Sequence, residues 1–302
     1  MKEELIPVFS GGIRRSGTTI VGTLLRKHPN LFSGAPNEVR FITEVYGLLD
    51  LVYGMHKVAP TQLTRVERIE LLNPLNNSIR FRYKMFRRKA AGYWWKRINR
   101  IGEESGIHKS MKWKKWVSLL DELESGLDDP VSAGRNFLFG YIKNHKRFNG
   151  QKYWMDTTPP NMMFASEIYR LFPEARFIEM RRNPLDNLAS VIPEPWGPNN
   201  LRTALPWFRD RIRLASQAKD LIPKDQYLTI WLEDLVLHNR EESYRKLLSV
   251  VGLEDDLNMN RFFREEVTAE KAHIGRWRNG FEDPERVRSE FLKVVGPIER
   301  ET

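Results

Sequence analysis

The segment 8–19 constrains the fold of this chain more than any other. A short apolar stretch, residues 6–9, enters a turn bracketed by Gly12 and Gly17, and an apolar-periodic segment starts at Ile20. This order predicts a strand, a glycine-rich loop and a helix. The N–H groups of such a loop, with the positive end of the helix, hold an anion. We therefore expect a phosphate-binding loop.

The loop departs from the nucleotide-binding pattern G-x-x-x-x-G-K-[ST] at one position, because Thr18 stands where the pattern has lysine. That lysine normally reaches the outer phosphates of a nucleoside triphosphate. Here the positive charge lies inside the loop instead, on Arg14 and Arg15. We expect a phosphate-like ligand other than ATP. A phosphate-loop kinase or nucleotide hydrolase stays open as an alternative, although no clear Mg²⁺-binding aspartate follows an apolar strand.

Composition narrows the class of protein. The 302 residues include no cysteine, which excludes disulfides, thiolate chemistry and cysteine-bound metals. Residues 1–7 lack the apolar run of a secretory signal, and no stretch approaches the roughly 20 apolar residues of a membrane span. We expect a cytoplasmic protein; the sequence carries no signal for its oligomeric state.

Apolar runs alternate with helical periodicity along the chain, which indicates an α/β fold. We expect a P-loop-type parallel sheet flanked by helices, in a single domain over 1–302, with 75–150 as a mostly helical basic and aromatic insert that contributes to the acceptor site. Further strands are expected at 31–32, 153–155, 175–180 and 227–231. Helices are expected at 41–72, at 132–148 with Ser132 as its cap, and at 161–172, 185–191, 203–222 and 239–251.

The excess positive charge of the chain lies entirely in one part of the insert. Residues 80–116 contain thirteen Lys and Arg against two Glu, a net of +11, whereas the whole chain has +10. Three interpretations stay open: a solvated helical face with aromatic residues packed on the core, a binding surface for an anionic acceptor, and a peripheral membrane contact. Nucleic-acid binding is not expected, because no nucleic-acid motif accompanies the charge.

Polar and basic residues gather where the expected strands end. They are Arg14 to Ser16, Asp156 to Thr158, and Arg181 to Asn183. Ligands of parallel sheets bind at the carboxyl ends of the strands, so these segments are expected at one edge. Two basic strand ends suggest a ligand with two anionic groups, such as a nucleotide with phosphate at both its 5′ and 3′ sides.

Several of these segments resemble the sulfotransferases that use 3′-phosphoadenylyl sulfate (PAPS). The resemblance rests on Arg15-Ser16-Gly17-Thr18-Thr19, on His28-Pro29, on Arg182-Asn183-Pro184-Leu185-Asp186-Asn187-Leu188-Ala189-Ser190, and on two weaker matches at Asp156–Asn161 and Gly275–Arg278. The matches are spread over residues 6–281 in the expected order. The first motif, through Arg40, is most similar to the protein-tyrosine sulfotransferase branch and its bacterial relatives.

The resemblance implies transfer of a sulfuryl group from PAPS to an acceptor hydroxyl, with release of adenosine 3′,5′-bisphosphate and with no metal. It implies that the 5′-phosphosulfate is held by the first loop, that Arg182 and Ser190 hold the 3′-phosphate, and that a C-terminal loop closes over the nucleotide. The loop residues are Arg14, Arg15, Ser16, Gly17, Thr18 and Thr19, and the closing residues are Arg276, Trp277 and Arg278, with Trp277 offering a face for adenine.

Two further roles follow from the resemblance. Glu38 occupies the position of the catalytic base, and Arg40 is suited to bind an anionic acceptor. Related enzymes have lysine at the position of Thr157, where it stabilises the departing phosphate. Either Arg14 replaces that cation, or the activity is reduced or altered. An inactive nucleotide-binding protein whose basic segment binds a membrane or a polyanion also stays open as an alternative.

Overall fold

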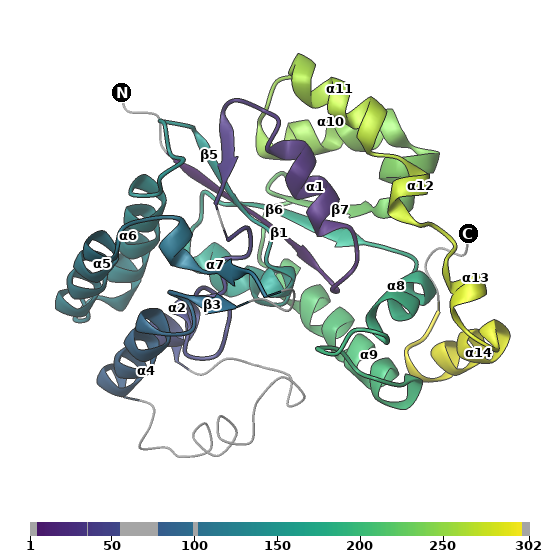
Figure 1. The fold of residues 1–302 in the computed structure, drawn as a ribbon, viewed down its shortest axis with the longest axis horizontal. Helices are drawn as coiled ribbons and strands as arrows, with labels where there is room; N and C mark the ends of the chain where they lie inside the picture. The colour runs from purple at the N-terminus through teal and green to yellow at the C-terminus, as the bar shows by residue number, and fades with distance from the viewer. Residues whose placement is uncertain (1–4, 35, 55–77, 99–101, 298–302) are drawn as a thin grey trace. The chain divides into compact units, whose positions relative to one another are not determined.

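Parallel strands form the framework of the protein, as the sequence predicts. The computed structural model describes residues 5–34, 36–54, 78–98 and 102–297 (Figure 1). The chain divides into two units: one is made of Met1–Pro7, Asn30–Thr158 and Glu167–Ala175, the other of Val8–Pro29, Pro159–Ser166 and Arg176–Thr302. The phosphate loop belongs to the second unit and Glu38 to the first. The expectation of a single domain stays a prediction.

Three parallel strands form the sheet of the second unit, in the order β1 (Ile6–Gly12), β6 (Arg176–Arg181) and β7 (Tyr227–Trp231). The register places Gly12 beside Met180, and Arg181 beside Trp231. The loops that follow β1 and β6 therefore leave the sheet at the same edge.

Helices cover both faces of these strands. Figure 1 shows α1, α10 and α11 on one side and α9 on the other. The α-helices are α1 (Thr18–Leu25), α8 (Pro184–Val191), α9 (Leu201–Lys219), α10 (Arg240–Val251), α11 (Leu257–Glu266), α12 (Ala269–Ala272), α13 (Trp277–Gly280) and α14 (Pro284–Val294), with a 3-10 helix η4 (Pro159–Phe164) and a π-helical turn η5 (Asp234–His238). Asn183 caps α8 through its side chain, and Pro184 occupies the first turn, where its missing N–H costs nothing.

The first unit joins a parallel strand pair to the insert. β2 (Leu31–Ser33) lies beside β5 (Tyr153–Asp156). The helices are α2 (Leu48–Tyr53), α4 (Ile79–Ala91), α5 (Trp113–Ser125), α6 (Pro130–Lys143) and the 3-10 helix η3 (Ile107–Lys109), while α7 (Ala165–Leu171) contains the boundary between the units at 166.

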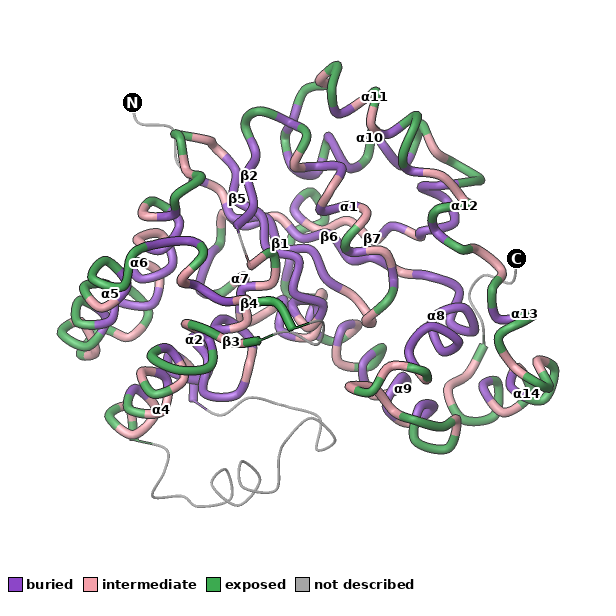
Figure 2. Tube along the Cα trace, viewed as in Figure 1, coloured by how far each residue is buried: buried purple, intermediate pink, exposed green. Residues whose placement is uncertain are grey.

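Phe41 is the centre of the aromatic core of the first unit. Its ring lies 5.2–6.4 Å from five other aromatic rings, those of Phe86, Trp94, Trp116, Phe137 and Tyr141. Figure 2 shows the matching pattern on α5 and α6, where buried and exposed stretches alternate along each helix. Several aromatic residues of the basic insert are therefore core residues, as the first of the three interpretations holds.

Three expectations need correction. The helix expected at 41–72 is only α2 among the described residues, and 55–77 lie outside them. Asp129 caps α6 by accepting from the N–H of Ser132 (3.1 Å), so Ser132 is not the cap. Within 75–116, residues 97–98 (β3) and 104–105 (β4) pair as an antiparallel hairpin where helix was expected.

A glycine follows the hairpin at a point where the backbone passes very close to Trp95. Gly106 has φ 132°, and a Cβ at this position would lie 2.3 Å from the carbonyl oxygen of Trp95. A larger residue could not bring the chain this close to Trp95. No helix within the described ranges is long and apolar enough to cross a bilayer.

Candidate active site: an arginine-lined phosphate loop

The backbone of the loop between β1 and α1 is shaped to present N–H groups to an anion. Gly12 has φ 151°, and a Cβ there would lie 2.2 Å from the carbonyl oxygen of Met180. Arg15 and Gly17 both have left-handed backbones, with φ of 71° and 98°. Left-handed residues in a turn direct successive N–H groups to one side. The N–H groups of Thr18 and Thr19 open α1 and have no acceptor within the helix, so they are available to an anion bound at the loop.

Arg15 and Ser190, which the sequence assigns to opposite ends of the same nucleotide, are in contact. Nε of Arg15 donates to Oγ of Ser190 over 2.8 Å, and Nη1 of Arg276 donates to the same oxygen over 3.4 Å. Ser190 lies on α8 and is 4% exposed, whereas Arg15 and Arg276 are exposed. Two guanidinium groups from distant segments therefore converge on one hydroxyl at the rim of the loop.

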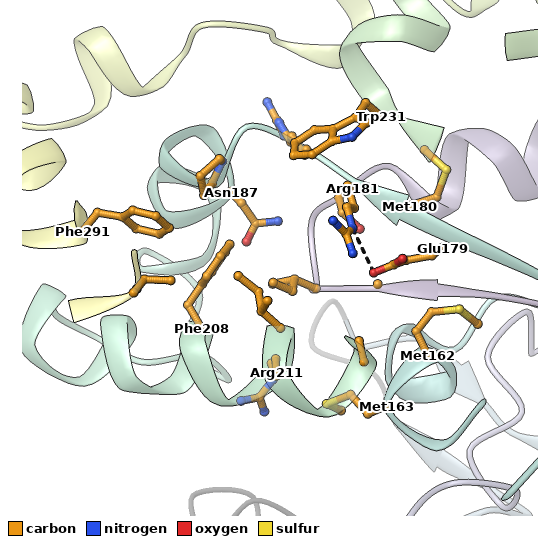
Figure 3. A pocket seen from close by; sticks show the side chains of 18 of the residues that line it. Met162, Met163, Glu179, Met180, Arg181, Asn187, Phe208, Arg211, Trp231 and Phe291 are labelled. Carbon is orange, nitrogen blue, oxygen red and sulfur yellow. Dashed lines mark hydrogen bonds and ion pairs between the residues drawn. The ribbon is translucent and has the colours of Figure 1, made fainter. Parts of the chain in front are cut away.

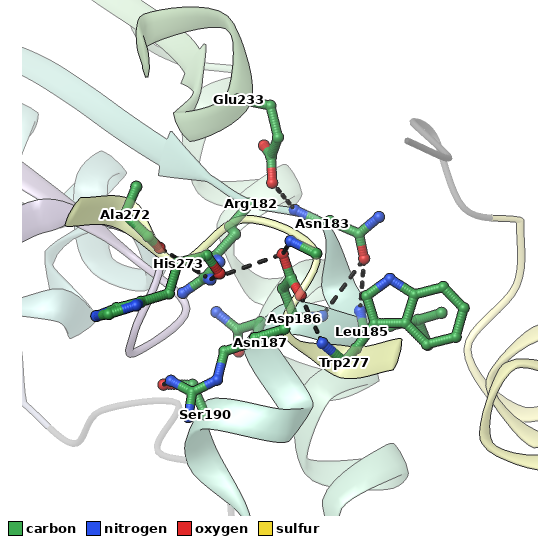
Figure 4. Close-up of polar contacts among 12 residues, drawn as sticks. Arg182, Asn183, Leu185, Asp186, Asn187, Ser190, Glu233, Ala272, His273 and Trp277 are labelled. Carbon is green, nitrogen blue, oxygen red and sulfur yellow. Dashed lines mark hydrogen bonds and ion pairs between the residues drawn. The ribbon is translucent and has the colours of Figure 1, made fainter. Parts of the chain in front are cut away.

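Arg182 holds three segments together, and Figure 4 shows its contacts with Ala272 and His273. Its Nη1 donates to the carbonyl of Arg15 (3.3 Å), and its Nη2 donates to the carbonyls of Ala272 (3.1 Å) and His273 (2.7 Å). It also pairs with Asp186 at 3.6 Å. Arg182 thus fixes the first loop against the segment that leads to Arg276.

The charges of these arginines act on one another. Burial lowers the pKa of Arg182; Asp186 and Glu233 oppose this, while Arg276 and Arg15 lower it further. The Nε of Arg182 is buried and has no hydrogen-bond partner among the residues that the structure describes. A buried donor without an acceptor is costly, and an anion at this place would relieve both the unmet bond and the repulsion.

Asp186 fastens the C-terminal loop to α8. It is fully buried, and its carboxylate accepts from the N–H of Gly275 (2.8 Å) and from the N–H of Trp277 (2.9 Å) (Figure 4). Arg276, between these two residues, is thereby placed at Ser190. The sequence motif contains Asp186 but assigns it no role; the available signal was a carboxylate four residues after Arg182, in the first turn of α8.

The remaining predicted residues of the C-terminal loop lie differently. Trp277 is 7% exposed and packs with Leu185, Leu188 and Phe291 in a buried cluster, so its ring offers no free face for adenine. Arg278 is exposed, with its guanidinium 5.1 Å from the centre of the Trp277 ring.

Arg14 and Ser16 flank Arg15 in the first loop. The guanidinium of Arg14 lies over the ring of Trp196 at 4.7 Å, and its carbonyl accepts from Nδ2 of Asn187 (2.9 Å). Ser16 uses its N–H in a turn to Ile13 (3.1 Å), and its hydroxyl is buried without a partner among the described residues. Thr18 is buried and Thr19 is exposed at the start of α1.

Glu38 belongs to a polar cluster in the first unit. The cluster also includes two residues of the insert, Tyr93 and Arg97. Its Oε2 lies 3.6 Å from Nη2 of Arg40, whose Nη1 also contacts Glu44 (3.4 Å) and the hydroxyl of Tyr93 (2.8 Å). Burial lowers the pKa of Arg40, but Glu44, Tyr93 and Glu38 more than reverse this, so that it is raised. Arg97 stacks on the Tyr93 ring at 5.4 Å. Sequence reasoning missed Tyr93 and Arg97.

The end of β5 holds the loop that carries Glu38. Asp156 is fully buried and accepts from the N–H of Val39 (2.7 Å) and from the hydroxyl of Thr158 (2.9 Å). Thr157 donates to the carbonyl of Asn37 from its N–H (3.1 Å) and from its hydroxyl (3.2 Å). Thr157, where related enzymes have lysine, therefore fixes the residue before Glu38.

Metal ligands do not gather in the described part of the chain: no group of three or more His, Asp or Glu is placed to hold an ion there. The expectation that no metal takes part stays a prediction.

Comparison with known proteins identifies the family. A sequence profile described as the sulfotransferase family matches residues 7–256. The sulfotransferase domain of the Synechococcus PCC 7002 olefin synthase is similar in structure, with a TM-score of 0.51 and 15% identity over 96% of each chain. Sulfotransferase STF1 from Mycobacterium tuberculosis H37Rv gives 0.50 and 12% identity over 97% of this chain and 78% of its own. No curated protein matches the sequence. These structural likenesses show a shared α/β fold, and the profile match shows that the chain belongs to the sulfotransferase family.

Proposed function

We propose that the donor is 3′-phosphoadenylyl sulfate and that its two anionic ends bind in the second unit. The observation that carries this proposal is the convergence of Arg15 and Arg276 on Ser190, directly beside the phosphate loop. The loop N–H groups suit the 5′-phosphosulfate, and the Arg182–Ser190 helix suits the 3′-phosphate. Charge-assisted hydrogen bonds from guanidinium and backbone groups are strong enough to bind both.

The proposed chemistry is direct transfer. The acceptor oxygen attacks the sulfur atom, the bond from sulfur to the bridging oxygen breaks, and the bridging oxygen stays on the 5′-phosphate of adenosine 3′,5′-bisphosphate. Arg15 and the loop N–H groups stabilise the charge that develops on this phosphate. The acceptor hydroxyl gives its proton to Glu38, which acts as the general base. The guanidinium groups supply the charge that a metal supplies in other phosphate sites.

Arg40 and Tyr93 support the role proposed for Glu38. Arg40 bridges Glu38 and Glu44, and Tyr93 holds Arg40, so the carboxylate of Glu38 is oriented by a chain of polar contacts. The insert, through Tyr93, thereby takes part in the proposed acceptor site. Arg40 is also proposed to bind an anionic group where the acceptor carries one, and Arg14 to supply the cation that Thr157 does not.

Isothermal titration calorimetry of the full chain tests the donor assignment. We expect adenosine 3′,5′-bisphosphate to bind tightly, and ATP to bind weakly. Binding of ATP without binding of the bisphosphate would refute the assignment and favour a kinase or hydrolase. A turnover assay with labelled donor then separates an active enzyme from an inactive nucleotide-binding protein.

A peripheral membrane contact through 80–116 is proposed as an additional property. Ile98 is 72% exposed and Trp113 is 45% exposed, and lysines 112, 114 and 115 flank Trp113 on the surface. Interleaved cations and aromatic side chains suit an anionic bilayer surface. Sedimentation with liposomes of neutral and of anionic lipid tests it. We expect binding to the anionic liposomes only, and absence of binding to the anionic liposomes would exclude the contact.

A further inference from the structure

Glu233 is a buried carboxyl group to which the proposed chemistry assigns no role. It follows the end of β7 by two positions and is only 1% exposed. Trp231, the last residue of β7, lines a cavity of about 240 Å³ in the second unit, and Glu233 does not (Figure 3). The protein therefore shields this carboxyl group from solvent. A buried carboxylate is costly unless charges or hydrogen bonds compensate it.

The two oxygen atoms of Glu233 differ in their bonding. Oε1 accepts from the N–H of Asn183 over 2.8 Å (Figure 4). Oε2 is buried and has no hydrogen-bond partner among the residues that the structure describes. An ionised carboxylate is stabilised by donors at both oxygen atoms, and a protonated carboxyl group still accepts at one of them. The bond to Asn183 therefore suits a protonated Glu233 as well as an ionised one.

Burial is the main influence on Glu233, and it raises the pKa of this carboxyl group. The N–H of Asn183 and the positive charge of Arg182 lower the pKa, while the negative charge of Asp186 raises it. The balance is upward, so Glu233 ionises less readily than an exposed glutamate does. Of the two charged residues, Arg182 is the one that favours the ionised form.

The charged groups of the other elements around Glu233 are exposed or bonded elsewhere. Asp234, the next residue, accepts from Nδ2 of Asn239 over 3.0 Å. α10 and α12 pack against η5, which follows Glu233, and their charged residues are exposed apart from Arg240. Arg240 donates to main-chain carbonyls, and the phenol of Tyr244 donates to an aspartate. The charge state of Glu233 therefore depends mainly on the residues where β6 leads into α8.

Binding of a 3′-phosphate would reverse the sign of the charge at this place. Five charged groups act on one another with a net charge of +1; they are Arg15, Arg182, Arg276, Asp186 and Glu233. A phosphate monoester carries close to two negative charges at neutral pH, so its binding changes the net charge to about −1. One proton on Glu233 then restores neutrality. Because like charges disfavour the ionised form of a carboxyl group, a bound phosphate favours uptake of this proton.

We propose that Glu233 is a positioning residue of the nucleotide site and that it takes up one proton when the 3′-phosphate binds. The inference rests on the proposed function, which assigns the 3′-phosphate to Arg182 and Ser190. Glu233 acts through Asn183: it fixes the N–H of Asn183, whose side chain caps the helix that carries Ser190. The proton comes from the solvent, forms an O–H bond on the carboxyl group, and returns to the solvent when the nucleotide leaves.

Calorimetry in buffers of different ionisation enthalpy counts the protons that the full chain takes up with adenosine 3′,5′-bisphosphate. Glu233→Gln keeps the acceptor for Asn183 and cannot titrate, so the difference between wild type and variant isolates this carboxyl group and cancels the ionisation of the ligand. Between pH 7 and pH 8.5, we expect the wild-type protein to take up more protons than the variant, by about half a proton to one proton at the maximum. Glu270→Gln removes an exposed charge of α12 and should match the wild type.

The pH dependence of affinity separates proton uptake from a merely structural role. Because the ionised carboxyl group opposes the phosphate, the affinity of the wild-type protein for the bisphosphate should fall relative to that of Glu233→Gln as the pH rises, by up to about tenfold per pH unit. The two proteins should be most alike at the lowest pH. A structural role alone would weaken binding by Glu233→Gln equally at every pH, and this result would overturn the proposal.

Adenosine 5′-phosphosulfate, which lacks the 3′-phosphate, gives a comparison that needs no variant. Over the same pH range, we expect the wild-type protein to take up at least about half a proton more with the bisphosphate than with the phosphosulfate. Equal uptake with the two ligands would overturn the proposal even if Glu233→Gln does not fold. Failure of the wild-type protein to bind the bisphosphate would refute the donor assignment and this inference with it, whereas binding without a difference in proton uptake would refute the role of Glu233 alone.

Discussion

Arg15 and Ser190 are 175 positions apart in the chain, yet Nε of the arginine donates to Oγ of the serine over 2.8 Å. This bond links the phosphate loop to α8. The cation assigned to the 5′-phosphosulfate therefore also touches the residue assigned to the 3′-phosphate. The guanidinium of Arg15 is therefore placed to interact with both anionic ends of the proposed nucleotide.

Ser190→Ala should weaken the binding of nucleotides that carry a 3′-phosphate and leave the binding of other nucleotides nearly unchanged. Loss of a hydrogen bond to a charged group costs about 1.5–3 kcal/mol, so we expect at least a tenfold loss of affinity for adenosine 3′,5′-bisphosphate. Adenosine 5′-phosphosulfate, which lacks the 3′-phosphate, should lose little. Calorimetry with both ligands measures the difference. Ser243→Ala, at a buried serine of α10, is the control, and equal losses for both ligands would contradict the assignment of Ser190.

Arg182→Ala should affect stability as well as binding. Three carbonyls would lose a donor, and Asp186 would stay buried without its cation, which costs about 3–5 kcal/mol in comparable pairs. Urea unfolding should therefore show a loss of several kcal/mol in the free energy of unfolding. The affinity of the folded variant for adenosine 3′,5′-bisphosphate should fall far more than its affinity for the analogue without the 3′-phosphate. A variant of normal stability would show that the carbonyl contacts contribute little.

Asp186→Asn should loosen the C-terminal loop. The carboxylate accepts from the N–H groups of Gly275 and Trp277, and an amide would present a donor to one of them. Hydrogen exchange at these two amides should become at least tenfold faster, with a milder loss of bisphosphate affinity because Arg276 is no longer held at Ser190. Asp283→Asn, at the cap of α14, tests whether any lost aspartate gives the same result. Unchanged exchange at 275 and 277 would show that α8 does not fasten this loop.

The sequence predicts the parts of this site that depend on local chemistry. The glycines at 12 and 17 and the capping Asn183 set backbone geometry within a few residues, so the loop and α8 lie where expected. The carbonyl partners of Arg182 are 90, 91 and 167 positions away in the chain, and no local pattern predicts them. Burial of Trp277 likewise depends on how α8, α13 and α14 pack. Tertiary packing, not propensity, decided what the sequence left open.

Glu38→Gln should greatly slow transfer and leave nucleotide binding unchanged. A glutamine keeps the size of the side chain but cannot accept the acceptor proton, and general base catalysis contributes about 10²- to 10⁴-fold. We expect kcat to fall within this range at unchanged affinity for the bisphosphate. Glu44→Gln, which also removes a partner of Arg40, should have a smaller effect on kcat. An active Glu38→Gln variant would point to a different base.

His145 should make the stability of the protein depend on pH. Burial, followed by the charges of Arg147 and Lys146, lowers the pKa of His145 to about 4. Its Nδ1 accepts from the N–H of Arg147 (3.0 Å), an arrangement that requires the neutral ring. In the unfolded chain a histidine titrates near 6.5. Between about pH 6.5 and pH 4 this histidine is therefore protonated in the unfolded state and neutral in the folded state.

The free energy of unfolding should accordingly fall as the pH drops through this window, by at most about 3 kcal/mol from this residue at 1.36 kcal/mol per pKa unit. Above about pH 7 the ring is neutral in both states, and the contribution is constant. His145→Gln removes the titrating group and should flatten the dependence, while a substitution at the exposed His273 should not. Urea unfolding at pH 7.5 and pH 4.5 gives the comparison, in which carboxylate titrations cancel. If His145→Gln and the wild-type protein lose equal stability over this range, the pKa of His145 is the same in the folded and unfolded states, and its burial does not lower it.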